Sequence, residues 1–387
     1  MSRTFTVPGD FATLAEAVAQ AQPDDVFELQ GQVTAGRTEL SVPMTLRGGV
    51  LIGTEVVLLR LLADVTLDGV TIQNPHGHGV VCMAGIPELV DVRIDVQGTA
   101  IACGATAAPR VVRAKILRCA IGMTVQDDAR PYVENLTITS MGSGLFFKGR
   151  GAGLFNQVGI LAGNMAAIEV SEEASPELVG VLISGGGAGG LFIHGSSTPR
   201  FTSTNILRAA LDAVEVRGAA APVIDGLRAE ECFKGGLLIT QDAGGTYLEV
   251  EVRGCMSAGL TVNERAHPEI ERMVLAGSSQ VGARIYGAAQ VEALDLKVTQ
   301  NLKGGVELGG GARLEAEDLV VTENLQFGLI ARDHAQLHAK RAVIRQNRGP
   351  GLVLVQQTVA ALHAAVIEDN SGGDVVTDGD AQLTQTA

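Results

Sequence analysis

Apolar and variable residues alternate over short segments of this chain, and each segment follows a small residue that recurs every 23 positions. The recurring small residues run from Gly144 to Asp374. Within a segment the alternation has period two, as in Leu260-Thr261-Val262, which is typical of a β-strand with one buried face rather than of a helix. A fixed period of this length indicates one supersecondary unit that is stacked on itself along the chain.

Two further apolar columns precede the small residues, by seven and by nine positions. They include Ile183, Val252 and Val298 in the first column, and Val181, Val250 and Leu296 in the second. Strands one repeat apart lie side by side, so like side chains stack at the strand spacing of about 4.8 Å. We therefore predict an all-β fold, a single-stranded parallel β-helix of about 13 coils with about 23 residues each. Parallel crossovers are overwhelmingly right-handed, so the predicted superhelix is right-handed.

The corners between strands also repeat. One corner carries a recurring asparagine, and stacked side-chain amides can pass hydrogen bonds along the axis. These asparagines are Asn301, Asn324, Asn347 and Asn370. Cys232 and Cys255 stand at the same place in earlier coils. The chain has five cysteines without CxxC spacing, which predicts small buried hydrophobes rather than disulfides or zinc ligands.

Residues 1–48 differ from the rest of the chain. Leu14, Ala17 and Val18 recur at helical spacing, and Pro23 follows them. We predict a strand–helix–strand cap in which the amphipathic helix covers the open end of the stack, followed by the first coil. The β-helix then occupies 49–376, and 377–387 form a polar C-terminal tail. A solenoid grows without adding separate cores, so we expect one structural domain.

Two stretches resemble known proteins. The opening, TVPGDFATLAEAVAQAQPDDVFELQGQV followed by VPMTLRG, resembles the cap and first coil of pectin-lyase-like right-handed β-helix proteins. The later repeats, with Ala-x-Pro, alternating apolar residues, Asn or Cys and then Gly-Leu, resemble the carbohydrate-binding and sugar-hydrolase repeat. The resemblance implies the fold. It leaves function open, because lyases, hydrolases, epimerases, phage tailspikes and plain interaction modules share this architecture.

Charge and hydropathy exclude several kinds of partner. The formal net charge is −14 and no basic stripe is visible, which argues against nucleic acid. No stretch reaches transmembrane length and no signal peptide is apparent, so we expect a cytoplasmic protein without a membrane partner. His338 and His363 do not share the 23-residue register, so the sequence predicts no histidine ladder for a metal. We expect no cofactor.

Gly77-His78-Gly79 resembles one element of the polygalacturonase signature. In that family it accompanies an Asn-Thr-Asp, an Asp-Asp pair and an Arg-Ile-Lys. Here no Asn-Thr-Asp precedes it, and the one candidate pair, Asp127-Asp128, comes afterwards. We interpret the motif as a glycine-rich corner that leads into a strand.

Candidate chemistry gathers on the outward side of the strands that follow the small residues. Glu169 and Glu215 lie two coils apart, which places their backbones about 9.6 Å from each other, at the wide end of an inverting glycosidase's carboxylate separation. Phe192 offers a ring to a sugar, with His194 and Arg217 beside it. Against this hypothesis, the chain has no Trp and only three Tyr. A solvated strand face is the competing interpretation.

We predict a non-catalytic scaffold or protein-interaction module, because catalytic signatures and long loop insertions are missing. The alternative is a polysaccharide hydrolase, a lyase or a sugar-binding protein that uses the face around 169–217. Two outward apolar columns in the C-terminal third suggest where a protein partner or a second copy binds, a twofold homodimer being the commonest arrangement. They consist of Val320, Val343 and Val366, and of Ile330, Val353 and Val376.

Overall fold

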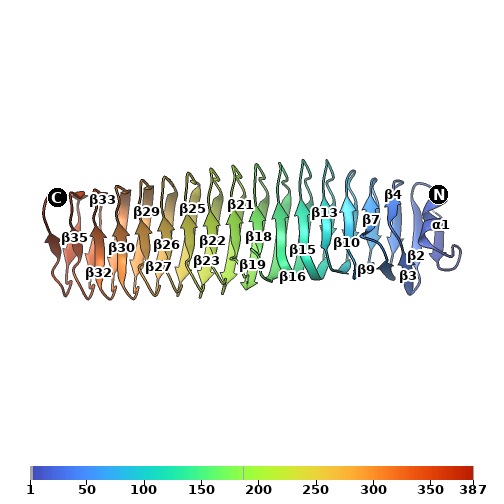
Figure 1. Cartoon of the computed structure of the whole chain (residues 1–387), viewed down its shortest axis with the longest axis horizontal. Helices are drawn as coiled ribbons and strands as arrows, with labels where there is room; N and C mark the ends of the chain where they lie inside the picture. Colours follow the sequence, from blue (N-terminus) through green and yellow to red (C-terminus); the bar gives the residue numbers. More distant parts are fainter. Residues whose placement is uncertain (1–2, 186, 387) are drawn as a thin grey trace. The chain divides into compact units, whose positions relative to one another are not determined.

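The computed structural model describes residues 3–185 and 187–386, and these residues wind into about 17 turns of parallel β-structure (Figure 1). They divide into two compact units, unit 1 (Met1–Gly187) and unit 2 (Ala188–Ala387). The predicted all-β parallel solenoid is confirmed.

Unit 1 contains a helix, α1 (Leu14–Ala19), and short strands in its first turns. Its strands are β1 (Thr4–Val7), β2 (Asp25–Leu29), β3 (Gln32–Ala35), β4 (Thr38–Leu40), β5 (Met44–Arg47), β6 (Val50–Gly53), β7 (Val57–Leu61), β8 (Thr66–Asp68), β9 (Thr71–Asn74), β10 (His78–Cys82), β11 (Glu88–Val90), β12 (Arg93–Val96), β13 (Thr99–Cys103), β14 (Arg110–Val112), β15 (Lys115–Val125), β16 (Tyr132–Phe147), β17 (Leu154–Ala162), β18 (Ile168–Val170) and β19 (Glu177–Gly185).

Unit 2 alternates a short strand with a long one in most of its turns. The short strands are β20 (Leu191–Ile193), β22 (Val214–Val216), β24 (Leu237–Ile239), β26 (Leu260–Val262), β28 (Ala283–Ile285), β30 (Gly304–Leu308), β32 (Phe327–Ala331), β35 (Leu352–Leu354) and β38 (Val375–Thr377). The long ones are β21 (Arg200–Leu207), β23 (Val223–Glu230), β25 (Thr246–Arg253), β27 (Glu269–Ala276), β29 (Gln290–Thr299) and β31 (Arg313–Thr322). The last turns divide the long strand into β33 (Gln336–Lys340) with β34 (Val343–Arg345) and β36 (Val359–His363) with β37 (Val366–Glu368), and β39 (Gln382–Thr386) follows.

The predicted count of about 13 coils is wrong, because the stack begins earlier and its first turns are shorter. Asp25 of β2 already pairs with Met44 of β5, only 19 positions later. In unit 2 the offset is 23, as between Leu260 and Ala283. A search for a 23-residue period does not detect these shorter turns.

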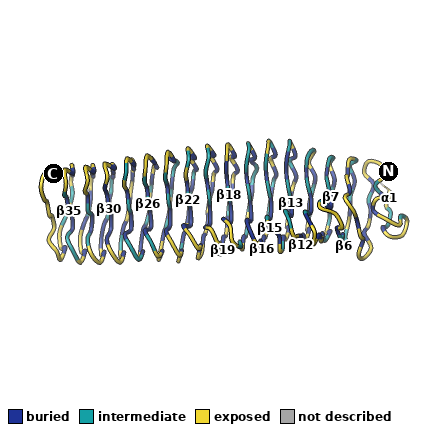
Figure 2. The backbone as a smooth tube through the Cα atoms, viewed as in Figure 1, coloured by how far each residue is buried: buried dark blue, intermediate teal, exposed yellow. Residues whose placement is uncertain are grey.

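The inward columns form the core of each unit. Leu260 and Val262 are fully buried, whereas Thr261 between them is half-exposed. Figure 2 shows the strands of the described turns as largely buried or intermediate, with most of the exposed residues at the corners. All five cysteines are free and buried, which confirms their interpretation as core residues. Burial raises the pKa of the Cys119 thiol to about 11, so it carries little thiolate.

A bend inside each long strand was not predicted. In β29 the buried residues are Val291 and Ala293 before the bend, then Leu296 and Val298 after it, so the alternation slips by one position. Asp295 at the slip has a left-handed backbone with φ 54°. The residues one repeat before and after it, Arg272 and Asp318, have φ 55° and 59°. Each long strand therefore presents two separate faces, one on each side of the bend.

The predicted asparagine stack forms at a corner of unit 2. Asn301, Asn324 and Asn347 are fully buried, and each side-chain Nδ2 donates to the Oδ1 of the next asparagine at 2.9–3.0 Å. The Nδ2 of Asn324 also donates to the carbonyl oxygens of Val298 and Thr322. Because these buried amides find partners along the stack, the corner holds successive turns together.

Helix α1 contains the three residues whose spacing predicted it. The Thr13 hydroxyl accepts from the Glu16 amide at 3.2 Å, and a Glu16 carboxylate oxygen accepts from the Ala12 amide at 3.1 Å, which satisfies amides at the helix start. Leu14 and Ala17 are buried. The role of this helix as a cover for the first coil stays a prediction, as do the boundaries at 48 and 376.

Candidate functional site

The strongest candidate site lies on the outward side of the short strands of unit 2, which we call the short-strand face. Two columns of side chains run across it. The first consists of Phe192, Glu215, Leu238, Thr261, Arg284, Glu307, Ile330 and Val353, which are successive partners in the parallel register. The second stands two positions further along and consists of His194, Arg217, Thr240, Asn263, Tyr286, Gly309, Arg332 and Val355.

Three of the four predicted site residues meet around Phe192. The rings of Phe192 and His194 stack with centroids 4.5 Å apart and an interplanar angle of 29°. The guanidinium carbon of Arg217 lies 4.3 Å from the Phe192 ring centroid, within cation–π range. Nη1 of Arg217 also lies 3.6 Å from Oε1 of Glu215. The structure therefore brings His194, Glu215 and Arg217 together on one aromatic platform.

Glu169, the fourth predicted residue, belongs to unit 1. It lies in β18, in register with Phe146 of β16. The predicted pairing of Glu169 with Glu215 across about two coils stays a prediction.

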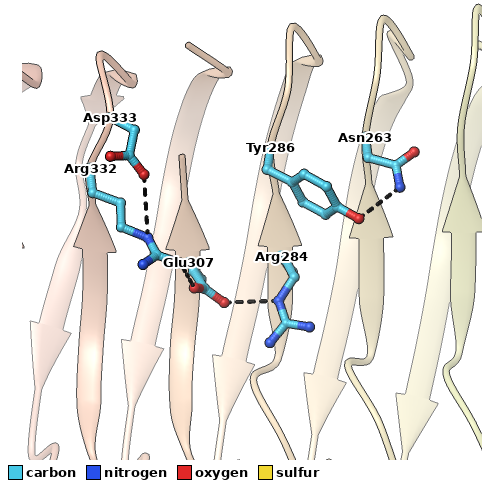
Figure 3. Close-up of polar contacts among 6 residues, drawn as sticks. All are labelled: Asn263, Arg284, Tyr286, Glu307, Arg332 and Asp333. Atoms are coloured by element: carbon cyan, nitrogen blue, oxygen red, sulfur yellow. Dashed lines mark hydrogen bonds and ion pairs between the residues drawn. The ribbon is translucent and has the colours of Figure 1, made fainter. Parts of the chain in front are cut away.

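A second polar cluster lies further along the face (Figure 3). Nε of Arg284 donates to Oε2 of Glu307 at 2.8 Å, and Nη2 of Arg332 donates to Oε1 of Glu307 at 2.6 Å. Both carboxylate oxygens of Glu307 are therefore held by guanidinium groups from the turns before and after it. Nδ2 of Asn263 donates to the Tyr286 hydroxyl at 2.9 Å. The cluster is a preformed network of planar polar groups.

This second cluster borders a hollow of about 500 Å³. The side chains around it are Arg284, Tyr286, Glu307, Arg332 and Asp333, and the remaining lining residues are Gly287, Gly309 and Gly310. Gly287 and Gly310 have φ 77° and 66°, a backbone conformation that favours glycine. A Cβ at Gly287 would lie 3.0 Å from the Glu264 amide nitrogen. The glycines thus let the corner turn sharply and leave the space above it open.

Sequence reasoning missed this cluster although its residues stand in the same two columns as the predicted ones. The carboxylate spacing of Glu169 and Glu215 favoured a site in the earlier coils. The available signal was the alternation of charge at Arg284, Glu307 and Arg332. Charges of opposite sign at neighbouring places in a stack indicate ion pairs between turns.

Other expected features occupy structural places. Nδ1 of His78, in the glycine-rich motif, accepts from the Thr99 amide at 2.9 Å, and the His78 carbonyl accepts from the Asn74 side chain. Across 3–185 and 187–386, no three His, Cys, Asp or Glu side chains gather closely enough to hold a metal ion. No helix in the same ranges is long and apolar enough to span a bilayer.

The chain belongs to the right-handed β-helix family. The model of that family, described as a right handed beta helix region, matches residues 119–248 and 235–386, which together exceed half of the chain. The family confirms the predicted handedness. A comparison with curated proteins found no match.

Several solved structures are similar over most of their length. The periplasmic alginate epimerase AlgG is 11% identical, with 99% of this chain and 82% of that chain covered and a TM-score of 0.38. The receptor-binding domain of the Siphovirus 9NA tailspike is 10% identical, with 100% and 76% covered and a TM-score of 0.41. The catalytic unit of a GH87 alpha-1,3-glucanase from Streptomyces thermodiastaticus strain HF3-3 is 11% identical, with 96% and 65% covered and a TM-score of 0.35. Family membership rests on the family model, and the activities of these proteins are not carried over to this chain.

Proposed function

We propose that this protein is a non-catalytic binding module that holds a protein partner on the short-strand face of unit 2. The composition of the two columns carries this proposal. They contain Arg217, Arg284 and Arg332 together with Phe192 and Tyr286, and no lysine stands in either column as far as the structure describes them. Arginine and aromatic residues are enriched in protein interfaces and their hot spots, whereas lysine is depleted.

The ion pairs of the face support binding rather than acid–base catalysis. A general acid must hold a proton for a leaving group, but both oxygens of Glu307 already accept from guanidinium groups. The same pairs fix Arg284 and Arg332 in place before a partner arrives. Because less side-chain freedom is then lost on binding, the association costs less.

An apolar side chain completes the proposed contact area. Leu238 is half-exposed and lies in the same column as the charged residues. Apolar centres with polar groups around them are usual in protein interfaces.

A sugar ligand is the second candidate, favoured by one observation. The hollow beside Tyr286 has about 500 Å³, within the usual size of small-molecule sites, and its Arg284 and Glu307 can donate to and accept from hydroxyl groups. A sugar would occupy the same residues as a protein partner, so the two candidates need a direct test.

The test is photo-crosslinking in cells of the source organism with p-benzoylphenylalanine placed at Tyr286. The control carries it at Leu161, which is 51% exposed in β17 of unit 1. We expect a discrete protein adduct from position 286 and none from position 161. The absence of an adduct, together with glycan-array binding that Tyr286→Ala abolishes, would favour the sugar. Neither adduct nor glycan binding would contradict both candidates.

A further inference from the structure

A second hollow lies in unit 2, on the part of the long strands that precedes the bend. Six successive strands line it, β25, β27, β29, β31, β33 and β36, and its volume is about 580 Å³. At about 4.8 Å between neighbouring strands it extends about 24 Å along the stack. It shares no lining residue with the short-strand face.

The floor of this groove is apolar and low. Ala293, Ala316 and Ala339 are neighbours in the register, and each is only 5–6% exposed. The same column carries Ile270 before them and Leu362 after them. Ala293, Ala316 and Ala339 line the hollow together with Ile270.

The walls of the groove are acidic on three of its six strands, β27, β29 and β31. Glu269, Glu292 and Glu315 follow one another in register on one side, and Glu271 and Glu317 lie on the other. Glu315, Glu271 and Glu317 have basic partners in unit 2, with Nζ of Lys340 lying 3.3 Å from a Glu317 oxygen. Neither Glu269 nor Glu292 forms an ion pair with another described residue, and the nearby Arg272 pairs with Glu249 and Glu271 instead.

This arrangement has an electrostatic cost in the free protein. Glu269 and Glu292 are both exposed and directly opposite each other on neighbouring strands, where like charges repel. A cationic ligand that lies over the groove removes that repulsion. The ligand must also cover the apolar floor with an aliphatic surface, which a bare ion does not have.

We propose that this groove binds an extended, lysine- or arginine-rich peptide segment of a partner protein. The alkyl stems of Lys and Arg lie against Ala293 and Ala316 of the floor and against Leu294, which is 43% exposed and stands between Glu271 and Glu317 in the second wall. Their charged ends reach the glutamates. About seven extended residues fit a length of about 24 Å. The acidic walls end at His338 and Lys340, which limits the basic segment at that side.

The test measures the fluorescence anisotropy of a labelled eight-residue peptide of alternating Lys and Ala, titrated with the full chain. We expect Glu269→Gln with Glu292→Gln to weaken binding about fivefold, as the loss of two solvated charge pairs predicts. The matched control, Glu177→Gln with Glu230→Gln, removes the same charge outside the groove and should change the affinity less than about twofold. Leu294→Lys places a cation on the groove and should weaken binding at least as much as the groove pair.

Three results would overturn the proposal. Equal weakening by both double variants would show that the peptide responds only to the net charge of −14. Unchanged binding to Leu294→Lys would show that the peptide does not cover the groove. The third result is displacement of the peptide by calcium or spermidine at the same concentration as the peptide. If the groove variant no longer shows this displacement, the groove is a small-cation site. The unfolding midpoint of each variant, followed by circular dichroism, confirms that it is folded.

Discussion

At the scale of single residues, Ile239 and Leu238 of β24 show how strictly the stack separates inside from outside. Ile239 is fully buried, whereas Leu238 is half-exposed on the short-strand face. A charged substitution should therefore be tolerated at Leu238 but not at Ile239.

Ile239→Asp should destabilise the protein by about 4 kcal/mol or more, because the carboxylate is buried without a partner. Urea unfolding followed by circular dichroism measures the loss and the width of the transition. The control, Leu238→Asp, should stay within about 1 kcal/mol of the native protein. Equal midpoints for the two variants would mean that the inward column is assigned wrongly.

The carboxyl group of Asp25 is held ionised at low pH by its hydrogen-bond partners. Nε of Arg3 donates to its Oδ1 at 2.9 Å and the Gln22 amide donates to its Oδ2 at 2.8 Å. The Arg3 hydrogen bond, aided by the Gln22 amide, lowers the pKa of Asp25 to about 2 from an ordinary 3.8. Asp25 joins β2 to the beginning of the described chain, so its ionised form stabilises the first turn.

A lowered folded-state pKa stabilises the protein above the unfolded-state value and ceases to do so as pH falls through the folded-state value. We therefore expect Asp25→Asn to lower the Tm at pH 7, with the gap to the native protein closing between about pH 4 and pH 2. Scanning calorimetry across that range measures the gap. A gap that stays constant down to pH 2 would contradict the assignment.

At the scale of elements, the left-handed bend decides the shape of each long strand. Asp295 has φ 54° and is exposed. A β-branched residue adopts this backbone only with strain, whereas glycine adopts it freely.

Asp295→Val should therefore destabilise the protein by about 1–2 kcal/mol, and Asp295→Gly should be close to neutral. Comparing the unfolding free energies of these two variants cancels the loss of the carboxylate, which is common to both. A valine variant as stable as the glycine variant would show that the bend is not needed at this position.

The parts of the fold that follow a strict period could be predicted from sequence. The inward column that contains Leu260 and the asparagine stack at Asn324 both keep a 23-residue register, so alternation and spacing were sufficient. The turns that begin at Asp25 vary in length, so a fixed period does not predict them. The bend at Asp295 was visible only as a slip of one position in the alternation.

The candidate site was predictable in part. Alternation identified the outward columns, and His194, Glu215 and Arg217 do meet around one ring. The double pairing of Glu307 could not be predicted, because it depends on how far two arginine side chains reach across neighbouring turns. The period of the sequence predicts which residues share a column, but it does not predict which side chains contact each other.

At the scale of the whole molecule, the proposed contact surfaces of unit 2 need partners. Val320, Val343 and Val366 are neighbours in register, as are Ile330 and Val353, which lead on to Val376. Val366 and Val376 are 44% and 39% exposed. We propose that a second copy of the chain covers these columns, because exposed apolar patches usually mark a contact.

Light scattering on the purified protein tests self-association. We expect twice the chain mass for the native protein and the single chain mass for Val343→Lys with Val353→Lys, because each dimer then buries unpaired lysines. The control, Val56→Lys with Val179→Lys in unit 1, should keep the native mass. A native protein that is a monomer at every concentration would contradict this proposal.

The most direct measurement of the central claim is the dissociation constant of the protein partner captured through position 286, determined by titration calorimetry with purified proteins. If the short-strand face is the recognition surface, Tyr286→Ala should weaken binding at least about tenfold, as expected for an aromatic hot spot. Leu161→Ala, the control in unit 1, should bind as the native protein does. A Tyr286→Ala variant that is folded and binds within about twofold of the native affinity would contradict the account.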